Sequence, residues 1–245
     1  MNIQYETLLK SGLHFGHLSH KWNPKMNDYI LTKKNKIHII NLNKSIIKLK
    51  LAGEKVYEIA KSGRKILFVG TKKHTKNIIS SYAKQVNMPY VSERWLGGML
   101  TNFSTLRRSI RKMSNMEKFK KDGLYQNMSK KEKLIFDRSY TKLNKLLHGI
   151  SILNRLPSAI FVIDINKEQI AINEAIKLGI PIIGIVDTNT DPSLIDYPIP
   201  GNDDSMKSIE LVVSLIVNEI DSAIKLRHKE KNSNNINLKT NNDKK

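Results

Sequence analysis

Three short apolar runs along the chain have the pattern of strands that are buried on both faces. They cover 66–70, 159–164 and 182–187, and each is rich in β-branched residues, continuous rather than alternating, and closed by Gly or Asp. Apolar residues at helical spacing lie before, between and after these runs. Because strands alternate with helices, the pattern predicts an α/β fold with a doubly wound parallel sheet. The expected helical stripe before the third run is made of Ile170, Ile172, Ala175, Ile176 and Leu178.

A segment in the middle of the chain interrupts this alternation. Leu106, Ile110 and Met113 are four and three positions apart, and a second apolar stripe follows over 143–153, after a turn at 121–123. Basic residues occupy many of the positions between them, so the segment 104–156 is predicted to be an antiparallel two-helix coiled-coil arm. The arm is inserted into an α/β domain formed by 1–103 and 157–226. The last residues, 227–245, are almost all polar and are predicted to be a disordered tail.

Positive charge is concentrated in one part of the chain. The 245 residues contain 42 Lys and Arg against 22 Asp and Glu, a net charge of +20, and 1–150 alone carry a net of +22. A cation excess of this size repels itself and normally persists because a polyanion neutralises it, so nucleic acid is the expected partner. A membrane surface and a drift in base composition, which also favours Lys over Arg, remain as alternatives.

Composition also excludes several classes of protein. The chain has no Cys, which excludes disulfides, Cys-ligated metal sites and a Cys nucleophile. No apolar run approaches the roughly 18 residues of a membrane helix. The first residues lack the basic and apolar regions of a secretory signal. We therefore expect a cytoplasmic protein without a membrane partner.

Aspartates at strand ends raise the question of catalysis. Asp164 and Asp187 end two predicted strands, where open α/β sheets bind ligands. Further aspartates follow at Asp191, Asp196, Asp203 and Asp204. A divalent-metal site for phosphate chemistry is one interpretation, and capping of turns is the other. The segment 70–73 lacks the spacing of a nucleotide-binding loop, and no nucleophile-elbow motif is present, so we do not expect an enzyme.

Three histidines near the N-terminus are candidate metal ligands. His14, His17 and His20 are three residues apart. Packing or hydrogen bonding near the sheet is one interpretation of this spacing. The other is a zinc ion held by His17 and His20 together with Asp187 and Asp204.

Two stretches combine an aromatic ring with cations, as RNA-binding surfaces do. In 21–26 a Trp lies between two lysines and beside a Pro, and in 94–102 an Arg-Trp pair precedes two glycines and the polar pair Thr-Asn. Core packing of either Trp is the alternative. The residues expected to contact RNA are Lys21, Trp22, Asn23, Lys25, Lys33, Lys34, Lys72, Lys73, Arg94, Trp95, Thr101, Asn102, Arg107, Arg108 and Arg111.

Eight collinear blocks closely resemble the small-subunit ribosomal protein S-two family in its bacterial form. They include His-Phe-Gly-His at 14–17, Trp-Asn-Pro-Lys-Met at 22–26 and Arg-Trp-Leu-Gly-Gly-Met-Leu-Thr-Asn-Phe at 94–103. The others are 35–42, 69–72, 156–157, 187–192 and 199–204. The resemblance runs from about residue 5 to 226.

The resemblance implies a flavodoxin-like α/β domain with a coiled-coil arm and a structural role in the small ribosomal subunit. It also implies binding to ribosomal RNA, contacts with neighbouring ribosomal proteins, and help in docking the messenger-RNA-binding ribosomal protein S-one. No small-molecule substrate or obligatory cofactor is implied. Departures are small: Lys36 stands where the family commonly has Gly, which can alter a turn, and Thr190 stands where it commonly has Cys.

The acidic residues of the C-terminal half are not explained by RNA binding. Carboxylates repel phosphates, so these side chains are expected to face away from RNA. We predict that Asp187, Asp191, Asp203 and Asp204 form a second surface, offered to a protein partner such as S-one or to a metal ion.

Overall fold

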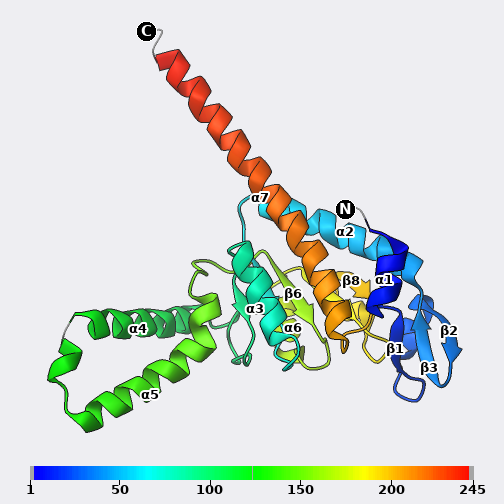
Figure 1. Ribbon diagram of the computed structural model, residues 1–245, viewed down its shortest axis with the longest axis horizontal. Coiled ribbons are helices and arrows are strands. Elements are labelled where there is room, and N and C mark those ends of the chain that lie inside the picture. Colours follow the sequence, from blue (N-terminus) through cyan, green and yellow to red (C-terminus); the bar gives the residue numbers. More distant parts are fainter. Residues whose placement is uncertain (1–2, 123, 243–245) are drawn as a thin grey trace.

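A five-stranded parallel sheet forms the centre of the protein in a computed structural model that describes residues 3–122 and 124–242 (Figure 1). The strands are β4 (Ile66–Val69), β5 (Tyr90–Val91), β6 (Ala159–Ile163), β7 (Ile182–Val186) and β8 (Tyr197–Pro200). All their pairings are parallel, in the order β5-β4-β6-β7-β8. This is the flavodoxin-like order, with a crevice at the carboxyl ends of β4 and β6, where the connections diverge. The predicted α/β class is confirmed.

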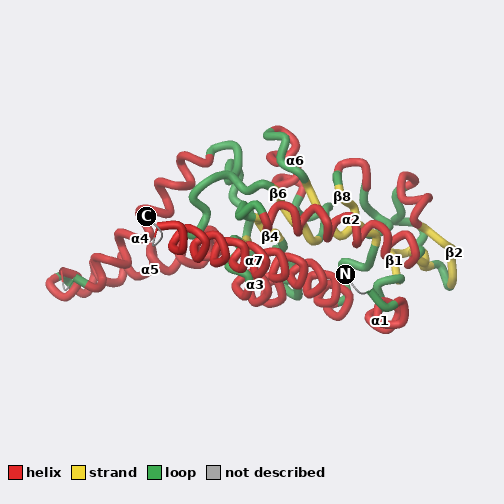
Figure 2. Tube along the Cα trace, turned by 90° about the horizontal axis from the view of Figure 1, so that it is seen from above, coloured by secondary structure: helices red, strands yellow, loops and turns green. Residues whose placement is uncertain are grey.

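Helices cover both faces of this sheet. On one face lie α1 (Tyr5–Ser11), α2 (Leu42–Lys61), α3 (Lys76–Gln85) and the long helix α7 (Met206–Asn242), which share one hydrophobic core with the sheet. Figure 2 shows α6 (Gln169–Lys177) on the opposite side from α3 and α7. The second core, on the α6 side, also takes in the 95–100 segment and the root of the arm. The two cores give the doubly wound arrangement that the sequence predicts.

The orientation of α6 differs from the predicted apolar stripe. Its buried positions are Ala171, Ile172, Glu174 and Ala175, whereas Ile170, Ile176 and Leu178 are 40–57% exposed. The helix is rotated so that a carboxylate, Glu174, enters the interior. Its hydrogen bonds, described below, compensate for the apolar contacts that the exposed residues do not make.

The predicted arm is a pair of helices that projects from the domain (Figure 1). It consists of α4 (Phe103–Lys121) and α5 (Lys130–Leu147), linked by the 3-10 helix η2 (Leu124–Asn127) and followed by η3 (His148–Ile150). The helices are antiparallel, since the outer part of α4 meets the start of α5 through Lys120 and Asp137, 2.9 Å apart. The root is packed in the second core. Regular coiled-coil packing along the arm stays a prediction.

A second, smaller sheet lies at the far end of the domain from the arm (Figure 1). Its strands are β1 (Phe15–Leu18), β2 (Ile30–Lys34) and β3 (Ile37–Ile40), paired antiparallel in the order β1-β3-β2. The 3-10 helix η1 (Pro24–Tyr29) connects β1 to β2, and η4 (Pro192–Leu194) precedes β8. The sequence did not predict this sheet, because its strands are short and carry exposed polar residues.

Helix α7 extends into the segment 227–245, for which the sequence predicts a disordered tail; disorder of this tail stays a prediction. Helix α7 continues to Asn242, and 243–245 lie outside the described residues. The C-terminal part of α7 continues a helix whose first part is packed on the sheet, and adding residues to an existing helix costs less free energy than starting a new one. An ion pair between Lys61 and Glu230, 3.6 Å apart, joins the extension to α2. In the described parts of the chain, no helix combines the length and the hydrophobicity needed to cross a bilayer.

The turn between β2 and β3 gives a test of backbone strain. Asn35 and Lys36 both have positive φ, 51° and 64°, as a two-residue hairpin turn requires. A non-glycine residue such as Lys36 pays about 1 kcal/mol for this conformation. We expect Lys36→Gly to raise the free energy of unfolding by about 0.5–1 kcal/mol, measured by denaturant titration. Lys33→Gly, inside β2, should lower it instead, and a loss of stability in Lys36→Gly would contradict the strain.

Candidate functional site

The crevice at the carboxyl ends of β4 and β6 is occupied by an internal ion pair. Lys72, just after β4, places its Nζ atom 2.7 Å from Oδ2 of Asp164, which ends β6. The same Nζ lies 2.8 Å from Asp204 and 3.5 Å from Asp203. Burial lowers the pKa of Lys72, but the hydrogen bonds to Asp164 and Asp204 outweigh it and hold that pKa above its usual range. The lysine therefore stays charged and is held by carboxylates.

A second carboxylate, that of Glu168, is bound to the backbone directly after β4, where an anionic ligand would otherwise bind. Glu168 accepts hydrogen bonds from the backbone N–H of Thr71 (2.9 Å) and from its hydroxyl (2.5 Å). Glu168 is 3% exposed, and burial raises its pKa despite these bonds. Protein carboxylates therefore already engage both Lys72 and the Thr71 donors after β4, and the predicted role of Lys72 as an RNA contact stays a prediction.

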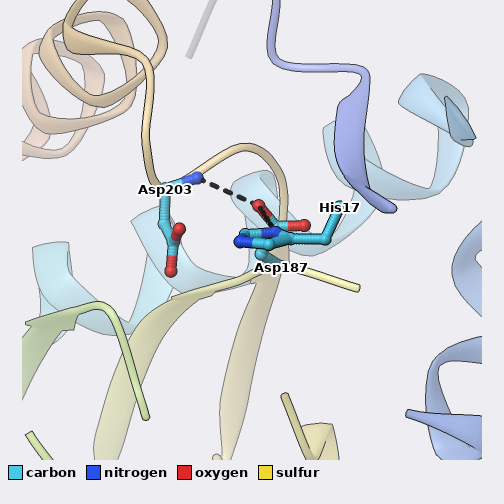
Figure 3. A group of neighbouring side chains, drawn as sticks. All are labelled: His17, Asp187 and Asp203. Atoms are coloured by element: carbon cyan, nitrogen blue, oxygen red, sulfur yellow. Dashed lines mark hydrogen bonds and ion pairs between the residues drawn. The ribbon is translucent and has the colours of Figure 1, made fainter. Parts of the chain in front are cut away.

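Next to this pair lies a cluster of one histidine and two aspartates (Figure 3). His17 in β1 places Nδ1 3.0 Å from Oδ2 of Asp187, which follows β7, and Asp203 comes from the loop after β8. The hydrogen bond to Asp187 raises the pKa of His17 against the effect of burial. Burial, reinforced by the charge of Asp187, raises the pKa of Asp203 to about 7.

This cluster corrects the predicted acidic surface. Asp187 and Asp203 are each 1% exposed, so neither can be offered to a protein partner. Asp204 is 57% exposed but bound to Lys72, and Asp191 forms an ion pair of 2.6 Å with Lys25. Asp187 and Asp203 therefore lie in the interior, whereas Asp191 and Asp204 are paired with cations of the chain itself.

The predicted zinc ligands are only partly brought together. His17 and Asp187 are neighbours, and Asp204 Oδ2 lies 3.4 Å from His17 Nε2. His20 is exposed and is not a member of the cluster. Asp203, which the prediction placed on the partner surface rather than among the ligands, takes its place. The sequence carried no sign of this, since only the fold brings residues 17 and 203 together.

The 94–102 segment is arranged around the buried carboxylate of Glu174. Trp95, 6% exposed, donates from Nε1 to Oε1 over 3.1 Å, and the backbone N–H of Gly98 donates to the same oxygen over 2.7 Å. The other oxygen accepts from the backbone of Leu100 and from both the N–H and the hydroxyl of Thr101. Burial raises the pKa of Glu174, but these hydrogen bonds outweigh it and the pKa is lowered overall.

This arrangement assigns a structural role to most of the segment. Trp95 is buried and cannot stack on a base, so that predicted RNA contact is wrong. Thr101 is exposed and its hydroxyl oxygen can still accept a hydrogen bond, so its predicted RNA contact stays a prediction. The alternative interpretation, that Trp95 packs in the core, is the correct one. Glu174 itself was missed by the sequence reasoning, although an acidic residue inside an apolar stripe was the available signal.

The remaining predicted RNA contacts divide into two groups. Half-buried Trp22 has its ring centroid 5.2 Å from that of His38, Asn23 accepts from the backbone N–H of Lys25, and Arg107 donates to Leu153 and Asn154. The exposed ones are Lys21, Lys25, Lys33, Lys34, Lys73, Arg94, Asn102, Arg108 and Arg111. Of these, Lys25 is held by Asp191, and Asn102 accepts a hydrogen bond from the hydroxyl of Ser104.

These features define a class of protein. It is a flavodoxin-like domain whose strand-end lysine, Lys72, is paired with carboxylates of the same chain, and whose arm carries exposed arginines. The family model described as Ribosomal protein S2 matches residues 8–223. The chain therefore belongs to the ribosomal protein S2 family, which consists of non-enzymatic structural proteins of the small ribosomal subunit.

Curated relatives agree with this assignment. The small ribosomal subunit protein uS2 of Cytophaga hutchinsonii is 53% identical over 229 residues, covering 94% of this chain and 90% of the relative. The protein of the same name from Karelsulcia muelleri is 55% identical over 215 residues, covering 88% and 97%. That from Porphyromonas gingivalis is 52% identical over 229 residues, covering 94% and 82%.

The Glu174 carboxylate should make a large contribution to stability. In Glu174→Gln an amide N–H₂ replaces one acceptor oxygen and meets buried N–H donors, so we expect a loss on the order of 3 kcal/mol in the free energy of unfolding at pH 7. Because the folded pKa is depressed below 4.5, this contribution is present above that pH and declines as the pH falls below it.

Denaturant titrations of both proteins between pH 7 and pH 3 measure this. The difference in the free energy of unfolding between wild type and Glu174→Gln should become smaller as the pH is lowered. Glu58→Gln is the matched control, since its carboxylate is 67% exposed and pairs with Lys55 at 3.1 Å; it should change stability by less than about 1 kcal/mol. Equal effects of the two substitutions would show that Glu174 is not the anchor.

Proposed function

We propose that this protein binds ribosomal RNA through the exposed cations of its N-terminal part and its arm, as a structural component of the small subunit. The observation that carries the proposal is the separation of charge. Asp164, Asp187 and Asp203 are turned into the interior, while Arg94, Arg108 and Arg111 face solvent. Aspartates held in the interior do not repel the phosphates that exposed arginines attract.

The arm supplies the most concentrated part of this surface. Helix α4 carries Arg107, Arg108, Arg111 and Lys112 within two turns, and its apolar residues Leu106, Ile110 and Met113 are buried at the root. Its cationic side is therefore held in place by packing. A projecting helix of this kind can lie along an RNA backbone that a compact domain would not reach, with Arg groups suited to bidentate phosphate contacts.

The competing class is a phosphate-processing enzyme that uses Asp164 and Asp187 with a divalent ion. Asp164 is paired with Lys72 at 2.7 Å, and Glu168 accepts from both the backbone N–H and the hydroxyl of Thr71. A phosphorylated substrate would have to displace both carboxylates from the crevice. The geometry therefore favours binding over catalysis.

Removal of two arm arginines should weaken RNA binding and reduce its salt dependence. We expect Arg108→Ala with Arg111→Ala to lower the affinity for small-subunit RNA at least tenfold at low salt. Each lost phosphate contact should make the slope of log affinity against log salt concentration shallower by about 0.7–0.9. Filter binding or fluorescence anisotropy over a salt series gives both quantities.

The matched control removes the same charge from the acidic half. Lys177→Ala with Lys207→Ala takes away two exposed cations on α6 and α7 and should leave affinity and slope within twofold of wild type. A wild-type slope near zero, or equal losses in the two double variants, would contradict phosphate contacts through the arm.

We further propose that ribosomal protein S-one docks on the arm rather than on the aspartates. A groove of about 550 Å³ lies between the outer parts of α4 and α5, with Met116, Phe119, Met128 and Phe136 on its walls. Arg108, Arg111 and Lys112 form a cationic lip. Apolar walls of Met and Phe beside a basic lip suit an amphipathic, acidic segment of a protein partner.

Polar substitutions in the groove test this docking. We expect Met116→Gln with Met128→Gln to reduce S-one on purified small subunits at least threefold, by removing apolar contact area, while the variant itself is incorporated normally. Leu134→Gln with Ile135→Gln is the control, since these arm residues are 52% and 55% exposed and lie outside the groove. Equal S-one recovery in both variants, by quantitative mass spectrometry, would place docking elsewhere.

A further inference from the structure

A small groove lies at the root of the arm, apart from the larger groove between its outer parts. It has a volume of about 160 Å³ and is lined by the 96–99 segment, by α4 and by α5. We call it the arm-root groove. An apolar cavity of about 150 Å³ can hold one benzene ring, so this groove has room for one planar ring. Its apolar walls are Leu96, Met99, Leu106, Leu143, Leu146 and Leu147.

The polar part of the arm-root groove is uncharged. Asn102, Thr105 and Ser109 complete the lining, and none of the described residues that line it is charged. The Oδ1 atom of Asn102 accepts from the hydroxyl of Ser104 over 3.4 Å, which leaves the amide N–H₂ as a donor. Ser109 donates to the carbonyl of Thr105 over 3.3 Å, which leaves its own oxygen as an acceptor. Donors and acceptors beside apolar walls suit the edge and the face of a nucleobase.

Gly97 leaves the backbone open at the groove. Its φ is not positive, and a Cβ atom added to it would meet no atom of the described chain within 4 Å. Neither the backbone conformation nor packing within the chain therefore requires glycine at this position, in contrast to Gly98, which has a φ of 85°. A residue without a side chain lets a ligand approach the backbone closely.

The charges around the groove favour a nucleotide over an isolated phosphate. Exposed Arg108 follows Thr105 by three positions on α4, so the two are neighbours on the helix surface, and exposed Lys142 directly precedes Leu143 on α5. The buried carboxylate of Glu174 accepts from the backbone of Gly98, which lines the groove. This carboxylate would repel a phosphate inside the groove but not an uncharged ring, whereas cations outside it attract phosphates.

We propose that the arm-root groove binds one unpaired nucleobase of small-subunit RNA, with the adjacent phosphates on Arg108 and Lys142. The inference rests on the RNA binding proposed above and names the part of the RNA that is recognised. Proteins read RNA sequence mainly at unstacked bases of loops and bulges, because the edges of paired bases in an A-form helix are poorly accessible. The groove adds contact with a base to the phosphate contacts of the arm.

Uncharged substitutions that fill the groove test this proposal in the full chain. Ser109→Leu and Thr105→Leu should each lower the affinity for small-subunit RNA about fivefold or more. The slope of log affinity against log salt concentration should stay that of wild type, because a base contact releases no counterions. Ser114→Leu is the matched control on α4, exposed and outside both grooves, and should bind as wild type does. Thr105 is exposed, so Thr105→Leu still tests the groove if Ser109→Leu proves unstable.

The salt series separates failure of the groove from failure of RNA binding. A steep wild-type slope with wild-type affinity in both groove variants would overturn the groove alone, and so would a shallower slope in these variants. A wild-type slope near zero would overturn the proposed RNA binding and this inference with it.

Photo-crosslinking in assembled small subunits identifies the occupant directly. A benzophenone amino acid in place of Thr105 should crosslink to one RNA nucleotide, detected as a single stop of reverse transcription. The same group in place of Ser114 should not give this stop. A crosslink from position 105 to a ribosomal protein would show that a protein side chain fills the groove, and would overturn the proposal.

Discussion

The ion pair between Lys72 and Asp164 determines what the rest of this domain can do. It lies at the point of a flavodoxin-like sheet where ligands normally bind, between the ends of β4 and β6. Asp164 adopts a positive φ of 67°, a conformation that Asp tolerates better than most residues. With Glu168 on Thr71, protein carboxylates engage both the ammonium of Lys72 and the donors of Thr71. The sheet is therefore a scaffold, and binding falls to the outer surface.

A second internal anchor works in the same way on the opposite face. Glu174 gathers the backbone from Gly98 to Thr101 and the indole of Trp95 around one carboxylate. This order fixes the segment that leads into α4, and so fixes the direction in which the arm leaves the domain. Carboxylates that are buried and hydrogen-bonded inside the protein do not repel a polyanion at its surface. Internal anchoring and the proposed binding of RNA at the outer surface thus follow from the same charge distribution.

The sequence predicted those elements that depend on local pattern. Continuous β-branched runs identified β4, β6 and β7, because a strand buried on both faces has no polar positions. Alternation with helical stripes identified the doubly wound sheet. Contacts between residues distant in sequence could not be predicted. His17 lies near Asp203 only because of the fold. Helix α6 is oriented with Glu174 toward the interior, so that its most apolar face is not the one that is buried. Trp95 was predicted to contact RNA because a sequence motif does not show whether a side chain is buried.

A density map of the assembled small subunit is the most direct test of this account. We expect this map to show Arg94, Arg108 and Arg111 within hydrogen-bonding distance of RNA phosphate oxygens. Lys72 should remain on Asp164, and Trp95 on Glu174. A map with Lys72 on a phosphate and Asp164 turned to solvent, or with the arm arginines away from RNA, would contradict the separation of inward carboxylates from outward cations.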